Sequence, residues 1–364
     1  MEMRKIFRKR NIFYALFALL IGSLSVVAFM RTSEPAYGRD EKSEIRNTKL
    51  RNVAYVTSGG TDIPDPTLMT DIYYAFGEIN PDFKSVDVIN PERLRQIVAL
   101  KEQNPDLNVM ICIGGFRKAG FSEMAGNAAL RKAFVADLKK VVNEYGLDGV
   151  DFDWEFPTTT AGGHTASPAD TQNYVKLVEE TRQALGDQKQ ISYYSNNSGK
   201  WINHKAMEPY VDYVMVSGYN IAAPPAHQSN LYTSSRFRGW SVDKAVEVHK
   251  ELGVPYSKIL MGIPFFYRTQ PVSNATRKDV TYFERRDLPD SIASMADAWD
   301  EEAQAPYLET AAATVFASYD SPRSVEAKGS YIRNKGLAGA FYWNYDSEDS
   351  THIMAKTMKR VMME

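Results

Sequence analysis

Cysteine is nearly absent from this sequence of 364 residues, in which Cys112 stands alone. The chain therefore cannot form an intramolecular disulfide and offers no cluster of thiolates to a zinc ion. An excess of positive charge is missing too, since 43 Lys and Arg are balanced by 45 Asp and Glu, for a net charge of −2. Phosphate backbones require a cationic field, so we expect no nucleic acid as a partner.

Histidine is also scarce, and none of the five histidines forms a metal-ligand pair of the H-E-x-x-H type. We therefore expect neither a metal nor a cofactor. What the chain does contain is average for a globular protein, with 44% hydrophobic and 24% charged residues. Aromatic residues make up 12% and include 21 Tyr. Because flat rings stack on the apolar faces of pyranoses, this content hints at a cleft that handles sugars.

The amino terminus has the features of an export signal. Five basic residues between positions 4 and 10 precede an uncharged run over residues 11–30, which ends at Arg31. About 20 apolar residues can span a bilayer, so residues 1–31 are expected to be either a cleaved signal peptide or a membrane anchor. In both cases the remainder is exported, and is secreted or tethered to the outer face of the cell membrane. Residues 32–51 are polar, without hydrophobic periodicity, and are expected to form a linker.

From Asn52 onward, short apolar runs alternate with amphipathic stretches, which is the pattern of βα units on a parallel sheet. Helical spacing is clear, for example, over residues 130–142. The fold class predicted for residues 52–364 is therefore α/β, a (β/α)8 TIM barrel with its active site at the carboxyl ends of the strands. The expected strands are residues 53–57, 71–79, 108–113, 149–155, 190–194, 213–219, 259–264 and 338–343.

One connection is too long for a simple barrel. Between the seventh and eighth expected strands lie residues 267–318, followed by an expected final helix at residues 322–334. An unstructured loop of that length would be exceptional in a compact domain. We expect a small α+β insertion there, standing beside the active site.

The densest chemistry lies on the fourth expected strand. Side chains alternate along a strand, so Asp151, Asp153 and Glu155 share one face while Phe152 and Trp154 take the other. Neighbouring carboxylates raise the pKa of at least one of them, as a general acid near neutral pH requires. A solvated edge strand and a metal site are the alternatives, although the ligand spacing of an EF-hand is absent.

Residues 148–155 resemble the D-x-x-D-x-D-x-E signature of family 18 glycoside hydrolases, the chitinases. The segments Tyr73-Tyr74-Ala75-Phe76 and Ile113-Gly114-Gly115-Phe116 are similar to the second and third strands of that family. Residues 262–268 and 339–343 are similar to the seventh and eighth. The resemblance extends from about Asn52 to the end of the chain and implies the same TIM barrel.

The resemblance also implies a mechanism. Glu155 would protonate the glycosidic oxygen, and the 2-acetamido oxygen of the substrate would attack C1 to give an oxazolinium intermediate with net retention. Asp153 would hold the acetamido N–H, while Asp151 exchanges a proton with Asp153. Tyr219 would steady the acetamido oxygen, or would be only a structural tyrosine.

Substrate contacts follow from the same resemblance. Trp343 would be the platform under the distorted sugar, unless it is a core tryptophan. Arg268 would face the cleft, unless it is an idle surface arginine. Asn220 replaces the Asp that the family usually has; it can donate to a sugar hydroxyl but carries no charge. The complete set of expected substrate contacts is Tyr55, Phe76, Gly115, Trp154, Asn220, Arg268 and Trp343.

The activity implied by the resemblance is retaining hydrolysis of β-1,4 bonds between N-acetylglucosamine units, so the expected partner is chitin or another glycan containing N-acetylglucosamine. One alternative is an endo-β-N-acetylglucosaminidase acting on N-glycans or cell-wall glycan. Another is a chitin-binding lectin, which lacks catalysis. The presence of Glu155 argues against the lectin.

Overall fold

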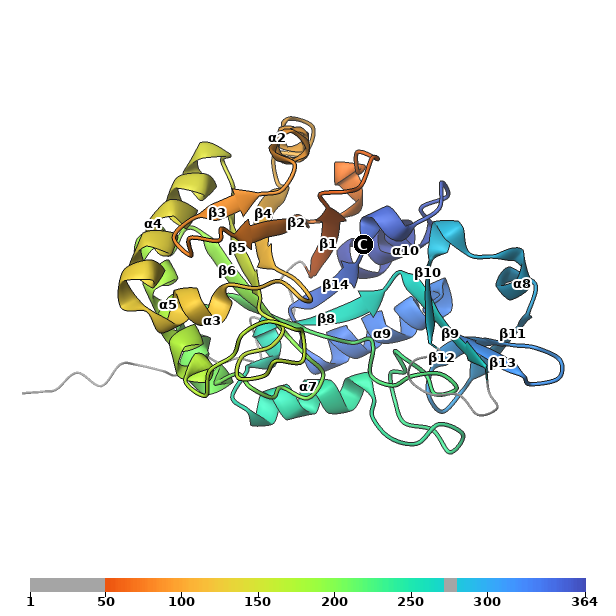
Figure 1. Cartoon of the computed structure of the whole chain (residues 1–364). Coiled ribbons are helices and arrows are strands. Elements are labelled where there is room, and N and C mark those ends of the chain that lie inside the picture. Colours follow the sequence, from red (N-terminus) through yellow and green to blue (C-terminus); the bar gives the residue numbers. More distant parts are fainter. Residues whose placement is uncertain (1–49, 272–279) are drawn as a thin grey trace, which may run out of the picture. The chain divides into compact units, whose positions relative to one another are not determined.

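The computed structural model describes residues 50–271 and 280–364. In this part of the chain, eight parallel strands close into a barrel in the order β1-β14-β8-β7-β6-β5-β4-β2, with β2 pairing back to β1 (Figure 1). This confirms the predicted (β/α)8 architecture. The short strand β3 (Val86–Val88) adds to β2 in antiparallel orientation. The barrel strands are β1 (Arg51–Thr57), β2 (Asp71–Ile79), β4 (Asn108–Gly114), β5 (Gly149–Asp153), β6 (Gln190–Ser195), β7 (Tyr213–Val216), β8 (Ile259–Pro264) and β14 (Gly339–Trp343).

Helices surround the barrel on its outside (Figure 1). The amphipathic stretch at residues 130–142 lies within α4, whose buried face includes Phe134, Leu138 and Val142. That face packs on the outer side of the strands, where burial of apolar area stabilises the fold. The helices are α2 (Pro91–Ala99), α3 (Phe121–Gly126), α4 (Ala128–Glu144), α5 (Asp170–Leu185), α6 (His204–Met207), α7 (Val242–Glu251), α9 (Pro322–Lys335) and α10 (Ile353–Met363).

Two strands end earlier than the sequence pattern predicts. Strand β5 stops at Asp153, the last residue that pairs with β4, and β7 stops at Val216, the last that pairs with β6 and β8. Glu155 and Tyr219 therefore stand on the loops beyond these strands. An apolar run can continue past the last ladder hydrogen bond, so hydrophobicity alone does not mark this boundary.

The long connection forms a separate antiparallel sheet of five strands in the order β10-β9-β13-β12-β11. It begins at Phe266, one residue before the expected start, and ends at Ser318. A small core of its own includes Tyr267, Leu308 and Ala317. The elements are β9 (Phe266–Pro271), β10 (Thr281–Glu284), α8 (Asp290–Ala293), β11 (Ala296–Asp300), β12 (Ala305–Glu309) and β13 (Val315–Ser318).

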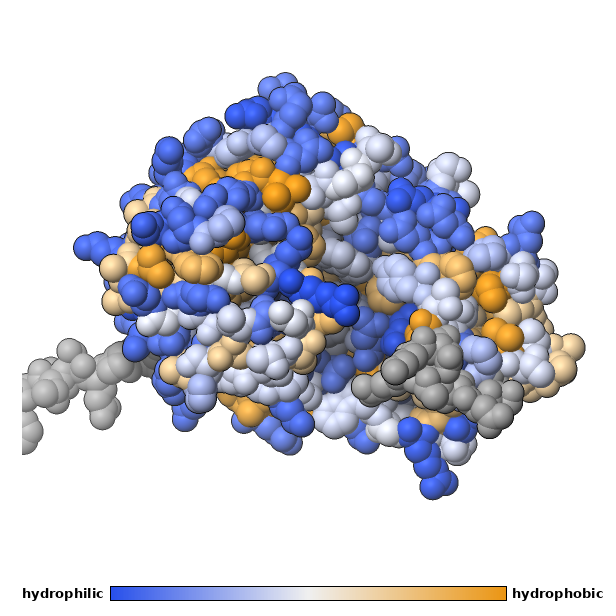
Figure 2. Space-filling view, in the orientation of Figure 1, coloured by the Kyte–Doolittle hydropathy of each residue, from blue (hydrophilic) through white to orange (hydrophobic). Residues whose placement is uncertain are grey.

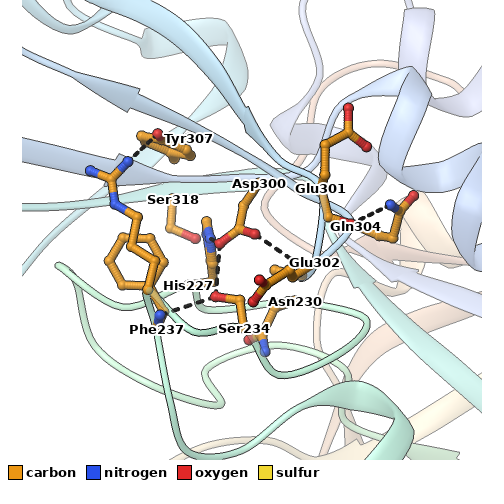
Figure 3. Close-up of polar contacts among 12 residues, drawn as sticks. His227, Asn230, Ser234, Phe237, Asp300, Glu301, Glu302, Gln304, Tyr307 and Ser318 are labelled. Carbon is orange, nitrogen blue, oxygen red and sulfur yellow. Dashed lines mark hydrogen bonds and ion pairs between the residues drawn. The ribbon is translucent and has the colours of Figure 1, made fainter.

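A buried polar cluster holds this insertion against the loop that follows β7 (Figure 3). His227 Nε2 lies 3.2 Å from Oδ2 of Asp300, and Ser234 Oγ donates to the same oxygen at 2.8 Å. The imidazole is 1% exposed and meets the edge of Phe237 with the ring centroids 4.5 Å apart. Burial lowers the pKa of His227, so the neutral ring donates its Nε2 hydrogen to the carboxylate. The loop fixed in this way also carries Asn220.

A second connection is a fully buried ion pair between Lys328 of α9 and Asp320. Lys328 Nζ lies 2.7 Å from Oδ2 and 2.8 Å from Oδ1 of Asp320, and donates to Ser229 Oγ at 2.6 Å. The pair ties α9 to the end of the insertion and to the loop after β7. Removing one partner of such a pair leaves the other charge buried and uncompensated.

We therefore expect Lys328→Met to lower the free energy of unfolding by about 3–5 kcal/mol. Urea denaturation measures this change. The control is Lys335→Met, because the pair of Lys335 with Glu247 lies partly exposed on the surface and its loss should cost under about 1 kcal/mol. The double variant Asp320→Asn/Lys328→Met should recover part of the loss. Equal small effects of both single lysine changes would contradict the role of the buried pair.

The predictions for the amino terminus lie outside the described residues. This applies to the signal peptide or anchor at residues 1–31, its apolar run at 11–30, and the linker as far as residue 49. Among residues 50–271 and 280–364, every helix is too short or too polar to cross a bilayer.

Candidate active site

A cavity of about 680 Å³ opens at the carboxyl ends of the barrel strands. This face is hollowed beside the insertion in the space-filling view (Figure 2). The position agrees with that of active sites in TIM barrels. The cavity is lined by Tyr55, Phe76, Phe116, Asp153, Glu155, Phe156, Tyr194, Asn196, Asn197, Ser217, Tyr219, Asn220, Phe266, Tyr282 and Trp343.

Asp151 is the deepest of the three carboxylates and is fully buried. Its Oδ2 accepts from the Tyr55 hydroxyl at 2.7 Å and its Oδ1 from Ser192 Oγ at 2.6 Å. Burial raises the pKa of Asp151, and these hydrogen bonds, together with one from Cys112, oppose the rise. Asp151 is thus fixed at the bottom of the site by hydrogen bonds from the neighbouring strands β4 and β6 and from β1, which is not a neighbour of β5.

Asp153 and Glu155 follow Asp151 along the chain, and both line the cavity. Burial, followed by the charges of Glu155 and Asp151, raises the pKa of Asp153 well above its usual range. Burial raises the pKa of Glu155 to about 7. Within the described residues, Oδ1 of Asp153 is buried without a hydrogen-bond partner. Asp153 and Glu155 therefore titrate as a coupled pair, and Oδ1 of Asp153 is available to accept a hydrogen bond.

The loop after β5 holds Glu155 in place. His164 Nε2 lies 2.7 Å from the carbonyl oxygen of Glu155. Further along, the carboxylate of Asp170 accepts from the backbone N–H groups of Ser167 at 2.7 Å and Thr158 at 3.1 Å. These contacts close the loop on itself and on the start of α5, so Glu155 lies at the cavity on a segment fixed by hydrogen bonds.

Aromatic rings form the wall. Trp343, at the end of β14, lies 5.5 Å from Tyr55 and 5.6 Å from Phe76 between ring centroids. Tyr219 meets the edge of Phe266 at 5.6 Å. Burial raises the pKa of Tyr219 well above its usual value, so its hydroxyl stays protonated and can donate. A flat indole beside a hydroxyl donor and two carboxyls suits a pyranose ring with a polar substituent.

The structure corrects one expected substrate contact. Trp154 is 1% exposed and stacks on Phe121 with centroids 5.0 Å apart and an angle of 9° between the planes. It directly follows β5, and its side chain belongs to the core between the barrel and the helices, whereas that of Asp153 lines the cavity. Its role is to pack the helices on the barrel.

Gly115 and Arg268 are not among the residues that line the cavity. Gly115 has φ +107°, and a Cβ there would lie 2.9 Å from the ring of Phe76. Its contribution is therefore to let that ring pack. Arg268 donates from Nη1 to the carbonyl of Ala222 at 2.9 Å, which links β9 to the loop after β7. The other expected contacts, Tyr55, Phe76, Asn220 and Trp343, all line the cavity.

Several lining residues were missed from the sequence. Phe156 could have been found, because it directly follows Glu155. Tyr282 comes from β10 of the insertion and stacks on Phe266 with centroids 4.5 Å apart. Its position depends on the register of β10 on β9, for which the sequence offers no marker. Asn196 and Asn197 stand on the loop after β6, where the hydrophobic pattern has ended.

With this geometry, comparison with known proteins is informative. The chain matches the model of the glycosyl hydrolases family 18 over residues 51–348 and belongs to that family. It is 27% identical over 335 residues to a probable endochitinase of Caenorhabditis elegans, covering 78% of this chain and 52% of that protein. It is 27% identical over 308 residues to chitinase A1 of Niallia circulans, covering 72% and 44% respectively. The chain thus spans about half the length of these curated relatives.

A solved structure is similar over its whole length. A glycoside hydrolase family 18 N-acetylglucosaminidase from Paenibacillus barengoltzii superposes with a TM-score of 0.78 and is 29% identical, covering 86% of this chain and 99% of that one. The fold of the described residues is therefore shared with that protein.

Proposed function

We propose that the protein is a retaining glycoside hydrolase that cleaves β-1,4 bonds between N-acetylglucosamine units of chitin or chitooligosaccharides. The observation that carries the proposal is the pairing of Glu155, whose pKa is raised to about 7, with Asp153 inside an aromatic cavity. The family and the names of the relatives agree with it. We further propose that the enzyme is exported, and is secreted or tethered through residues 11–30.

The proposed first step needs one proton and one internal nucleophile. With the sugar on Trp343, Glu155 donates its proton to the glycosidic oxygen as the C1–O bond breaks. The 2-acetamido oxygen of the same sugar bonds to C1 and closes an oxazolinium ring, so a new bond to C1 replaces the one that breaks. The unpartnered Oδ1 of Asp153 accepts the acetamido N–H, and the Tyr219 hydroxyl donates to the acetamido oxygen.

In the second step, the Glu155 carboxylate takes a proton from water. The water oxygen bonds to C1, the acetamido oxygen leaves, and the configuration at C1 is that of the substrate. Asp153 stabilises the positive charge that develops on the sugar. Asp151 can share a proton with Asp153, because both carboxyls have raised pKa values. Glu155 is thereby protonated again, and the enzyme returns to the state in which the reaction began.

The experiment that tests the proposed function is incubation of the purified protein with chitin oligosaccharides and, separately, with an N-glycosylated protein. Release of reducing ends from the oligosaccharides supports the proposal. Release of intact N-glycans with no cleavage of chitin oligosaccharides would replace it with the endo-β-N-acetylglucosaminidase alternative.

Asn220 offers a test of the electrostatics. Asn220 lines the cavity together with Glu155, and an aspartate there would add a negative charge that disfavours deprotonation of the acid. The pKa of Glu155 should rise, and the alkaline limb of kcat/KM against pH should move upward by up to about one pH unit in Asn220→Asp.

The control for this variant is Asn143→Asp, which adds the same charge at an exposed position on α4. Its pH profile should match that of the wild type. A limb that stays in place or moves to lower pH in Asn220→Asp would contradict the electrostatic explanation.

A further inference from the structure

Trp201 is an exposed aromatic residue held in an unusual conformation. It lies between β6 and α6, is 37% exposed, and has φ +72°, a region that bulky residues rarely adopt. Thr171 Oγ1 donates to its carbonyl at 2.8 Å. In the same loop, His204 Nε2 lies 3.0 Å from the carbonyl of Gly199. These contacts fix the backbone that carries the indole in a costly conformation, which is common at functional positions.

The indole continues the wall of the cavity. Phe156 lines the cavity and stacks on Trp201, with ring centroids 5.1 Å apart and an angle of 28° between the planes. Asn196 and Asn197, on the same loop as Trp201, also line the cavity. The aromatic surface therefore passes from the reacting centre through Phe156 to Trp201, which is not itself a lining residue.

The size of the cavity indicates that a long substrate would also contact the aromatic surface outside it. At about 680 Å³ the cavity is of the size of a small-molecule site, roughly 300–1,000 Å³, so a long chain of sugars must continue outside it. A fixed, solvent-facing indole offers a flat apolar face to such a chain, and the indole side chain loses little conformational entropy when a sugar binds.

We propose that Trp201 is a stacking platform for an N-acetylglucosamine unit of a longer chain, outside the cavity that holds the reacting sugar. The inference rests on the proposed function. It makes Trp201 a determinant of chain-length preference: a hexasaccharide reaches it, and a disaccharide bound in the cavity does not.

The test measures binding in Glu155→Gln, so that the oligosaccharide survives. Trp201→Gly is added, because glycine adopts positive φ without strain and the backbone keeps its course. Calorimetric titration with chitin di- and hexasaccharides should show Kd for the hexasaccharide rising about two- to tenfold and Kd for the disaccharide unchanged. Trp201→Phe in the same background should restore part of the hexasaccharide affinity. Tyr232→Ala, which truncates another exposed aromatic, serves as the control and should change neither value.

The possible outcomes separate the inference from the proposed function. Equal weakening at both chain lengths would assign Trp201 a structural role through Phe156 and overturn the platform, as would unchanged affinity at both lengths. If Glu155→Gln bound neither oligosaccharide, the proposed substrate class and the platform would both be wrong. Binding by Glu155→Gln without hydrolysis by the wild type would overturn the proposed activity alone.

Discussion

Glu155→Gln should lower kcat for chitin oligosaccharides by about 10²–10⁴. Glutamine keeps the shape and the hydrogen-bonding reach of the side chain but has no proton to transfer. Burial raises the pKa of Glu155 to about 7, so the acid is protonated below that pH and loses its proton above it. The kcat of the wild type should therefore decrease as the pH rises through about 7, whereas the residual kcat of the variant should not show this decrease.

The control is Glu144→Gln, an exposed glutamate at the end of α4. It should retain wild-type kinetics. Thermal unfolding of both variants checks that the fold is unchanged. Hydrolysis by Glu155→Gln at a rate near that of the wild type would show that another group is the acid.

Substrates without the acetamido group should bind but resist cleavage. Asp151 is held by Tyr55 and Ser192 at the bottom of the site, and the free oxygen of Asp153 is placed to accept an N–H. In the proposed mechanism both carboxyls have these roles, and the nucleophile comes from the sugar. Fully deacetylated chitosan oligomers should therefore give no measurable cleavage under conditions in which the acetylated oligomer of equal length is consumed.

Binding and turnover are measured separately for this prediction. Competition by the deacetylated oligomer against hydrolysis of the acetylated one measures its binding, and reducing-end release measures its cleavage. Cellulose oligomers, which carry a hydroxyl in place of the acetamido group, are a second comparison. Brisk cleavage of either substrate would require a nucleophile other than the acetamido group, either an enzyme carboxylate or water, and would rule out the substrate-assisted route.

Much of the fold follows from alternation and periodicity. The period of two along the strand places Asp151 and Asp153 on one face. Glu155 lies beyond the end of β5, and it is the loop after the strand that brings it to the same cavity. The same rule placed Trp154 on the opposite side, and its inclusion among the sugar contacts conflicted with that rule. The long connection can be identified as an insertion, because an unstructured loop of that length would be exceptional in a compact domain.

Other features depend on pairings that a sequence does not display. The contact of Tyr282 with the cavity requires the register of β10 on β9, and the stacking of Trp201 on Phe156 joins two loops. Lys328 and Asp320 look like solvated surface charges in the sequence, whereas in the structure both side chains are fully buried and Lys328 also contacts Ser229 on the loop after β7. Strand ends at Asp153 and Val216 are set by neighbouring strands rather than by local residue preference.

The most direct measurement is the anomeric form of the first product. Proton NMR during the first minutes of hydrolysis of a fully acetylated chitin oligosaccharide should show the β anomer at the new reducing end, with the α anomer appearing later by mutarotation. That result is required by attack of the acetamido oxygen followed by water, with Glu155 as acid and then base. The α anomer as the first product would contradict this mechanism, because water would then have displaced the leaving group in a single step.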